Sequence, residues 1–299
     1  MLRILKDWTL PIAMITGALL HRAFDHLAFL TPYLLFVMLL LTFAKMSPRD
    51  IRWRPVHGWL LLIQLAGCVG VYAALAGFNP VVAESTLICV LAPTATSAVV
   101  ITGMLGGNIA LLATYTLLAN LAVAIAAPIL FSLLGTHSQM PFFESFLFIF
   151  RQVFLLLILP MLCAWAMRKF TPRLHSRLVG LHQLSFYLWA IALTIVIGKT
   201  VVFLIDQEQP DYRTEIFIGL AALVICILQF LLGRWLGHRY GDAVSAGQGL
   251  GQKNTILAIW MAQSYLNPIA SIGPASYVIW QNCINSYQLW LKRRNSIKN

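Results

Sequence analysis

Ten apolar runs follow one another along this chain, and their length limits the fold more than any other feature. A helix needs about 20 apolar residues to cross the hydrocarbon core of a bilayer. These runs lack the alternation of barrel strands, and backbone polar groups in lipid must then be satisfied inside helices. A composition that is 60% hydrophobic and 10% charged excludes an ordinary soluble globule. We therefore expect an all-α polytopic membrane protein with spans at residues 8–24, 28–45, 57–77, 81–104, 108–134, 146–168, 181–204, 214–236, 243–265 and 268–291.

Basic residues in the connections between these runs predict how the chain is oriented. With ten spans, both ends of the chain lie on the same side of the membrane. That side collects nearly all of the loop Lys and Arg residues, whereas the other side holds only Arg22, Arg151 and Arg213. By the positive-inside rule both ends face the cytoplasm, and we expect a plasma membrane, with a bacterial inner membrane favoured. The net charge of +11 is then a topology signal, and it gives no support to nucleic-acid binding.

The number of spans also predicts an internal repeat. We expect one transporter domain over residues 1–299, because no long linker interrupts the chain. Ten spans divide into two sets of five, at residues 1–134 and 146–291. Because each set has an odd number of spans, the second set enters the membrane from the opposite side and has the inverted orientation. Transporters built from inverted repeats bind their substrate near the midplane, where helices in equivalent positions are broken. The fourth and ninth spans should therefore be broken.

Helix-breaking residues do fall in those two spans. The fourth contains Pro93, which lacks a backbone donor. The ninth contains Gly247, Gly249 and Gly251, which have low helix propensity, directly before Lys253. A proline kink and close packing of glycines between helices are the alternative explanations. Their equivalent placement in the two halves favours a broken-helix site.

Lys253 is the strongest functional indication in the sequence. A charged side chain at mid-membrane is costly, and such residues usually line a substrate or ion path. The alternative is a lysine that reaches an interface from a helix end, but Lys253 lies well inside the run between Asp242 and Asn267. No carboxylate occupies the centre of a predicted span, so an anionic substrate would supply the counter-charge. The cysteines show no metal-ligand spacing, and we expect neither a bound metal nor a cofactor.

At the two broken spans the chain resembles the bile acid:sodium symporter family. Residues 92–99, Ala-Pro-Thr-Ala-Thr-Ser-Ala-Val, resemble its fourth-span pattern Cys-Pro-Gly-Gly-Thr-Ala-Ser-Asn. Residues 249–255, Gly-Leu-Gly-Gln-Lys-Asn-Thr, resemble its ninth-span Glu-x-Gly-x-Gln-Asn-Ser, and residues 280–282, Trp-Gln-Asn, resemble its Trp-His-Asn. The resemblance implies a core domain and a panel domain, with the fourth and ninth helices crossing where they unwind. It also implies transport of bile acids, steroid conjugates or small carboxylates, usually with two sodium ions.

The resemblance further implies which residues form the site. The residues expected to contact an organic anion are Thr94, Thr96, Ser97, Asn254 and Asn282. The residues expected at the former ion sites are Gln64, Thr116, Gln252 and Lys253.

The departures from the family pattern concern its sodium ligands. Ala98, Val99 and Leu112 stand where polar side chains form the first sodium site, and Gly249 stands at the glutamate shared by both sites. Methyl groups supply no oxygen to a hard cation. Lys253 replaces a glutamine of the second site, where its charge would repel a sodium ion.

These departures predict that Lys253 replaces sodium as a tethered cation, reaching toward Gln64 and the unwound backbone carbonyls. Transport by alternating access would then be independent of sodium. The tethered charge cannot leave during the cycle, but its proton can, because loss of hydration disfavours a charged amine. A proton-coupled carrier and a uniporter fit equally well.

Other functions remain as alternatives, namely a sodium-coupled organic-anion symporter and a membrane ligand sensor that does not transport. Thr94 occupies the position of the reactive cysteine of the related arsenite carriers, which argues against metalloid transport. We expect no enzyme, because no span carries an Asp-rich magnesium site, a His-Glu-x-x-His motif or a nucleophile with a base. The partners expected are the lipid bilayer and a small organic anion, with no prediction of the oligomeric state.

Overall fold

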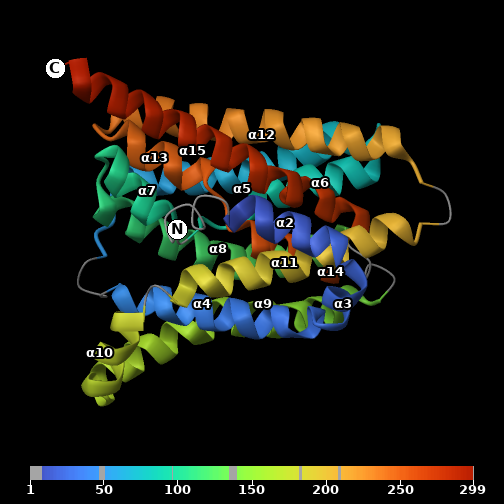
Figure 1. Cartoon of the computed structure of the whole chain (residues 1–299), viewed down its shortest axis with the longest axis horizontal. Coiled ribbons are helices and arrows are strands. Elements are labelled where there is room, and N and C mark those ends of the chain that lie inside the picture. Colours follow the sequence, from blue (N-terminus) through green and yellow to red (C-terminus); the bar gives the residue numbers. More distant parts are fainter. Residues whose placement is uncertain are drawn as a thin grey trace.

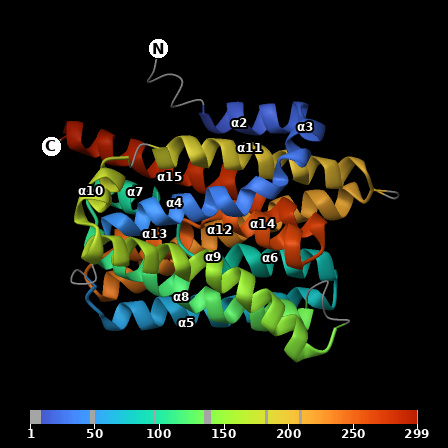
Figure 2. The ribbon, with the colours of Figure 1, turned by 90° about the horizontal axis from the view of Figure 1, so that it is seen from below.

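The computed structural model describes residues 9–46, 51–95, 97–134, 140–181, 184–207 and 210–298, and these are helical with no β-strand. The helices run along a common direction (Figures 1 and 2). The long ones are α4 (Thr31–Lys45), α5 (Pro55–Ala76), α8 (Ile109–Leu134), α9 (Phe142–Phe170), α11 (Leu184–Ile205), α12 (Tyr212–Arg239) and α15 (Ile272–Lys298). The short ones are α2 (Thr9–Leu19), α3 (His21–His26), α6 (Pro80–Leu91), α7 (Ser97–Leu105), α10 (Pro172–Gly180), α13 (Ala243–Gly251) and α14 (Thr255–Tyr265).

Six helical segments among the described residues are long and apolar enough to cross a membrane. They are residues 28–45 and helices α5, α8, α9, α11 and α12, and they match six predicted spans to within a few residues. Helix α15 is long enough, but its polar residues keep it out of this group. The all-helical membrane fold is confirmed, whereas the ten-span inverted repeat with halves at 1–134 and 146–291 stays a prediction.

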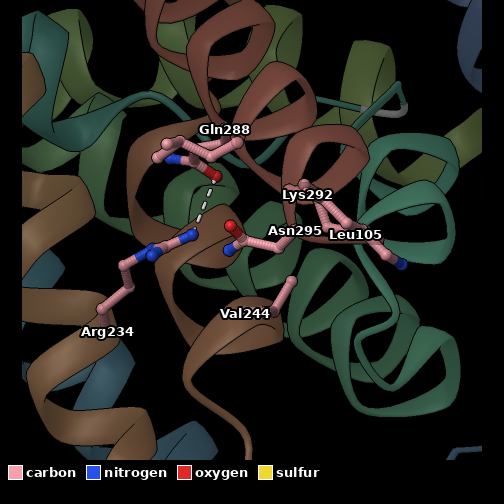
Figure 3. A pocket seen from close by; sticks show the side chains of 7 residues that line it. Leu105, Arg234, Val244, Gln288, Lys292 and Asn295 are labelled. Carbon is pink, nitrogen blue, oxygen red and sulfur yellow. Dashed lines mark hydrogen bonds between the residues drawn. The ribbon is translucent and has the colours of Figure 1, made fainter. Parts of the chain in front are cut away.

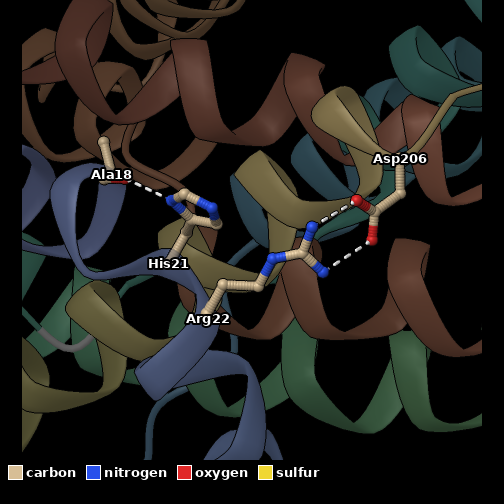
Figure 4. A network of polar contacts seen from close by, with 4 residues as sticks. All are labelled: Ala18, His21, Arg22 and Asp206. Carbon is tan, nitrogen blue, oxygen red and sulfur yellow. Dashed lines mark hydrogen bonds and ion pairs between the residues drawn. The ribbon is translucent and has the colours of Figure 1, made fainter.

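The first predicted span differs from a continuous helix. The run at 8–24 divides at Leu20 (φ −105°, ψ 30°) into α2 and α3. Arg22 on α3 forms an ion pair with Asp206 after α11, with Nη2 and Oδ1 2.9 Å apart (Figure 4). Both side chains are largely exposed, so the pair contributes less than about 1 kcal/mol. The fold therefore depends little on this polar contact.

The stretch 169–180, which lies between the predicted spans 146–168 and 181–204, contains a helix in the structure. Pro172 begins α10, a position where its missing N–H costs nothing. Leu178 and Val179 pack against the core, while Arg173 and Arg177 are exposed. The sequence reading missed this helix because its apolar stripe covers only two turns.

Helix α10 and the C-terminal ends of α9, α12 and α15 lie at the same end of the bundle (Figures 1 and 2). We call this end the basic end, after Arg168, Arg173, Arg239 and Lys292, which lie in its helices. These four cations, which the sequence assigned to one side of the membrane, thus lie at one end of the described bundle. That this side faces the cytoplasm stays a prediction.

Helix α13 packs tightly along α12. A Cβ atom on Gly237 would lie 2.7 Å from Cβ of Ala246 and 2.8 Å from Cα of Ala243, so only glycine permits this approach. Gly241, at φ +79°, makes the sharp turn between the two helices. Helix α12 also packs against α6 and α15, and these contacts position the broken segments described next.

Candidate functional site

The fourth and ninth predicted spans are each broken, and the two breaks lie against each other. Helix α6 ends at Leu91 and α7 begins at Ser97, while α13 ends at Gly251 and α14 begins at Thr255. Thr94 and Lys253 form an antiparallel bridge. We call the described residues of these breaks, 92–95 and 252–254, the crossing.

Backbone hydrogen bonds hold the crossing together. Ala95 N donates to the carbonyl oxygen of Gln252 at 2.9 Å, and Asn254 N donates to that of Pro93 at 2.8 Å. Ala92 is extended (φ −46°, ψ 137°), as expected for a residue before proline. Backbone groups freed from a helix must find partners inside a membrane protein, and here each break supplies them to the other.

The carbonyl groups at the C-terminal end of α6 bind two side chains. Lys253 Nζ donates to Val90 O at 2.8 Å, and Gln64 Nε2 donates to Leu91 O at 2.7 Å and to Ala92 O at 3.0 Å. Lys253 is 1% exposed. A helix C-terminus carries unpaired carbonyls and a partial negative charge, so an ammonium group is favoured there. Lys253 and Gln64 therefore cap α6 together.

The end of α13 is capped in a similar way by hydroxyl groups. Thr94 Oγ1 donates to Gly249 O, and Tyr277 OH donates to Gly251 O, each at 2.8 Å. Lys253 is also fixed through its backbone, since its N–H donates to Gln281 Oε1 at 2.9 Å. The C-terminal carbonyls of both half-helices thus have side-chain donors.

The other two half-helices begin at the crossing with their N-terminal ends. Asn254 caps α14 by accepting from Leu257 N at 3.3 Å. At the start of α7, Ser97 is exposed and its hydroxyl accepts from Gln252 Nε2 at 2.9 Å. Helix N-termini carry partial positive charge, so the crossing presents two positive helix ends.

The Tyr115 ring packs directly against Gly249. A Cβ atom on Gly249 would lie 2.8 Å from Cδ1 of Tyr115, so the tyrosine ring occupies the space that a side chain at position 249 would need. Its hydroxyl donates to Gln64 Oε1 at 2.7 Å. A glutamate at position 249 would collide with this ring.

The structure places most of the residues predicted for the site at the crossing. Thr94, Gln252, Lys253 and Asn254 belong to it, and Gln64 reaches it from α5. Thr96 lies outside the described residues. The sequence predicts that Lys253 reaches toward Gln64 and the unwound carbonyls; in the structure its Nζ binds Val90 O, while Gln64 binds the neighbouring carbonyls of Leu91 and Ala92.

Two predicted residues point their polar groups into their own helices. Thr116 Oγ1 donates to Leu112 O at 2.9 Å, and Asn282 Nδ2 donates to Val278 O at 2.7 Å. Their roles at an ion site and a substrate site stay predictions. The neighbour Gln281 contacts the crossing instead.

The sequence reading missed Tyr115, Tyr277 and Gln281 as members of the site. A buried tyrosine needs a partner for its hydroxyl, so a tyrosine inside an apolar span indicates a polar contact in the bundle. It does not reveal which distant carbonyl is that partner. Among the described residues, no group of three His, Cys, Asp or Glu side chains could hold a metal ion.

A family model described as SBF-like CPA transporter family matches residues 9–283. The chain belongs to the SBF-like CPA transporter family. This membership confirms the resemblance drawn from the two broken spans. It makes the protein an integral membrane transporter and agrees with the expectation that it is not an enzyme. No curated protein matches the sequence.

Proposed function

We propose that this SBF-like transporter carries a small organic anion by alternating access without sodium, with Lys253 in the place of the coupling ion. The single observation that carries the proposal is the bond from Lys253 Nζ to the end of α6. Unwound helices in transporters offer their carbonyl groups to cations. Here the cation is part of the chain.

The acceptors that a sodium ion would need are already engaged. The carbonyl oxygens of Val90, Leu91 and Ala92 accept hydrogen bonds from Lys253 and Gln64. Sodium, a hard cation, needs several oxygen ligands. A mobile ion at this place would compete with two fixed donors and meet a like charge.

The crossing favours an anion on electrostatic grounds. Lys253 neutralises the negative end of α6, and the hydroxyls of Thr94 and Tyr277 bind the carbonyls at the negative end of α13. The N-terminal ends of α7 and α14 carry partial positive charge, and among the described residues no acidic side chain neutralises it. Ser97 is exposed at the start of α7. We infer that a carboxylate or sulfate group binds near these two helix ends.

A thermal-shift panel tests the proposal before the substrate is known. The purified chain is screened with bile acids, steroid conjugates and small carboxylates, each in sodium buffer and in choline buffer. Ligand binding raises the apparent unfolding temperature, and the shift should be the same in both buffers. A shift that requires sodium would contradict the proposal.

Two variants separate the charge from its surroundings. Lys253→Gln removes the ammonium group and should abolish the response to the best anion. Lys199→Gln is the matched control, because Lys199 lies on α11 with its Nζ over the Phe203 ring, 5.6 Å from the ring centroid. The control should respond like the parent protein. An equal loss of the anion response in both variants would contradict a specific role of Lys253 in binding.

A pH gradient then distinguishes the two mechanisms of transport. Coupling to protons through Lys253 requires that an acidic outer side accelerates uptake into vesicles, and that Lys253→Gln abolishes the acceleration. Uptake at the same rate with and without the gradient identifies a uniporter in which the ammonium keeps its charge.

A further inference from the structure

A cavity opens at the basic end of the bundle, away from the crossing. Its volume is about 410 Å³, and it lies between α7, α12, α13 and α15. The residues that line it are Leu105, Arg234, Val244, Gln288, Leu291, Lys292 and Asn295. Two are cations and none is acidic, so its charge is positive. We call it the basic pocket.

Three polar side chains of the basic pocket, Arg234, Gln288 and Asn295, point toward one another (Figure 3), whereas Lys292 Nζ points away and donates to Met104 O at 2.9 Å. Arg234 Nη2 donates to Gln288 Oε1 at 3.1 Å, and the amide of Asn295 points toward the same part of the pocket (Figure 3). A guanidinium has five N–H donors in a planar fork. The bond to Gln288 uses one nitrogen, and the fork suits the oxygens of a carboxylate or phosphate.

Asp242, two positions before the pocket residue Val244, binds other partners. Asp242, just before α13, accepts from Ser245 N at 2.9 Å, from Ser245 Oγ at 2.6 Å and from Asn108 N at 2.9 Å. It caps α13 and joins this helix to the segment after α7. Its carboxylate is therefore held by donors of its own, and Arg234 pairs with an amide.

A stripe of polar residues on α15 connects the basic pocket with the crossing. The residues are Gln281, Asn285, Gln288, Lys292 and Asn295, and their spacing of three and four places them on one helical face. Gln281 binds the backbone of Lys253, and Gln248 Nε2 donates to Asn285 Oδ1 at 2.9 Å and to Gln288 Oε1 at 3.2 Å.

This stripe is not fully hydrogen-bonded among the described residues. Gln248 Oε1 and Asn285 Nδ2 are buried and have no partner there. Buried polar groups without partners are uncommon in folded proteins, and a bound water molecule or ion is one explanation for them. They lie directly behind Gln288, on the side toward the crossing. The polar lining of the pocket thus extends into the bundle.

Aromatic residues place the mouth of the pocket at the depth of lipid headgroups. The Arg239 guanidinium lies over the Trp235 ring on α12, and that of Arg294 lies over the Trp290 ring on α15. Both tryptophans are about half exposed. Tryptophan with basic neighbours is typical of membrane interfaces. Anions in solution and phosphates of lipids both reach this depth.

We propose that the basic pocket is a second anion site, which binds one phosphate or carboxylate group through Arg234 with help from Asn295. It is separate from the crossing, because none of its lining residues belongs to the crossing. The group comes either from a soluble anion or from the headgroup of an anionic lipid. Both sources offer the same oxygens to the same guanidinium fork.

The test measures binding of inorganic phosphate to the purified full chain in an uncharged detergent. The unfolding temperature is followed against phosphate concentration, with chloride added to hold the ionic strength constant. The parent protein should be stabilised in a saturable way. Arg234→Gln should raise the half-saturating concentration at least about tenfold, because a charge-assisted hydrogen bond is lost. Arg234→Lys keeps a charge and should retain part of the response.

Arg239→Gln is the matched control, since Arg239 lies on the same helix but over Trp235. It should respond to phosphate like the parent protein. Lys253→Gln should do so too, which separates this site from the one at the crossing. Equal weakening by Arg239→Gln and Arg234→Gln would show general charge screening and overturn the proposal.

A second arm identifies the source of the anion. The protein is extracted from vesicles that contain phosphatidylglycerol or phosphatidylcholine, and the retained lipid is measured by native mass spectrometry. Phosphatidylglycerol held by the parent protein and Arg239→Gln, but lost from Arg234→Gln, identifies a lipid headgroup. A response to free phosphate without such retention identifies a soluble anion. If Arg234→Gln changes neither the response to phosphate nor the retention of phosphatidylglycerol, the proposal is overturned.

Discussion

The Nζ atom of Lys253 lies 2.8 Å from the carbonyl oxygen of Val90, in the last turn of α6. The two residues come from different broken spans, so the bond joins the half-helices at the point where both unwind. Lys253 is 1% exposed, and no carboxylate is among its hydrogen-bond partners in the described residues. A buried cation without a charged partner costs stability, and the carbonyl end of α6 offsets only part of this cost. Its presence at the crossing is therefore better explained by transport than by folding.

Lys253→Met tests that distinction. The thioether side chain is unbranched, one atom shorter than that of lysine, and uncharged, so the penalty for burying an ammonium disappears while one hydrogen bond to Val90 is lost. We expect an unfolding temperature that does not fall, together with uptake that drops at least about tenfold. A structural lysine would give the opposite pattern, a destabilisation of about 3 kcal/mol or more. Thermal unfolding and vesicle uptake of the same preparation measure both quantities.

Tyr115→Phe should weaken the crossing without changing its shape. The substitution leaves the buried Oε1 of Gln64 without its donor, and an unsatisfied buried acceptor costs about 1–3 kcal/mol. Chemical denaturation of the purified protein measures the loss. Tyr187→Phe serves as the control, because Tyr187 is 51% exposed, and it should leave stability unchanged within about 0.5 kcal/mol.

Gly249→Ala should destabilise the protein by about 1–3 kcal/mol, because its Cβ would lie 2.8 Å from Tyr115. The double variant Gly249→Ala with Tyr115→Leu should recover part of this loss, which a double-mutant cycle measures as a coupling. The control is Gly70→Ala on α5, where a Cβ meets nothing within 4 Å. Alanine there should stabilise the helix by up to about 1 kcal/mol. Additive effects at 249 and 115 would contradict the close packing.

Asp242→Ala should loosen the entrance to the broken ninth span. The carboxylate caps α13 and holds Asn108, and loss of an N-cap costs about 1 kcal/mol. Asp242→Asn keeps a capping oxygen and should lose less. Hydrogen exchange of the first turn of α13 checks the prediction, and unchanged protection in Asp242→Ala would contradict the capping role.

The sequence predicts the broken spans because proline and glycine act locally. Pro93 lacks a backbone donor and disfavours a helical residue before it, and the glycines at the end of α13 lower its helix propensity. Proline alone does not decide the break, because Pro128 and Pro160 lie inside the continuous helices α8 and α9. The lengths of the apolar runs likewise predict α5, α8 and α12 to within a few residues.

Partners across the fold are not predictable in this way. Lys253 and Val90 are 163 positions apart, and only packing selects that carbonyl rather than a neighbouring one. Tyr115 and Gly249 fit each other through shape, which no spacing reveals. The helix α10 was missed because a two-turn amphipathic stripe is too short to stand out from a polar connection.

The dependence of uptake on sodium tests the central claim most directly. The chain is reconstituted into vesicles, and the anion that gives the largest thermal shift is taken up with sodium chloride or with choline chloride outside. We predict equal initial rates in the two salts for the parent protein. A rate that falls tenfold or more in choline would contradict the account, because a mobile sodium ion would then perform the role assigned to Lys253.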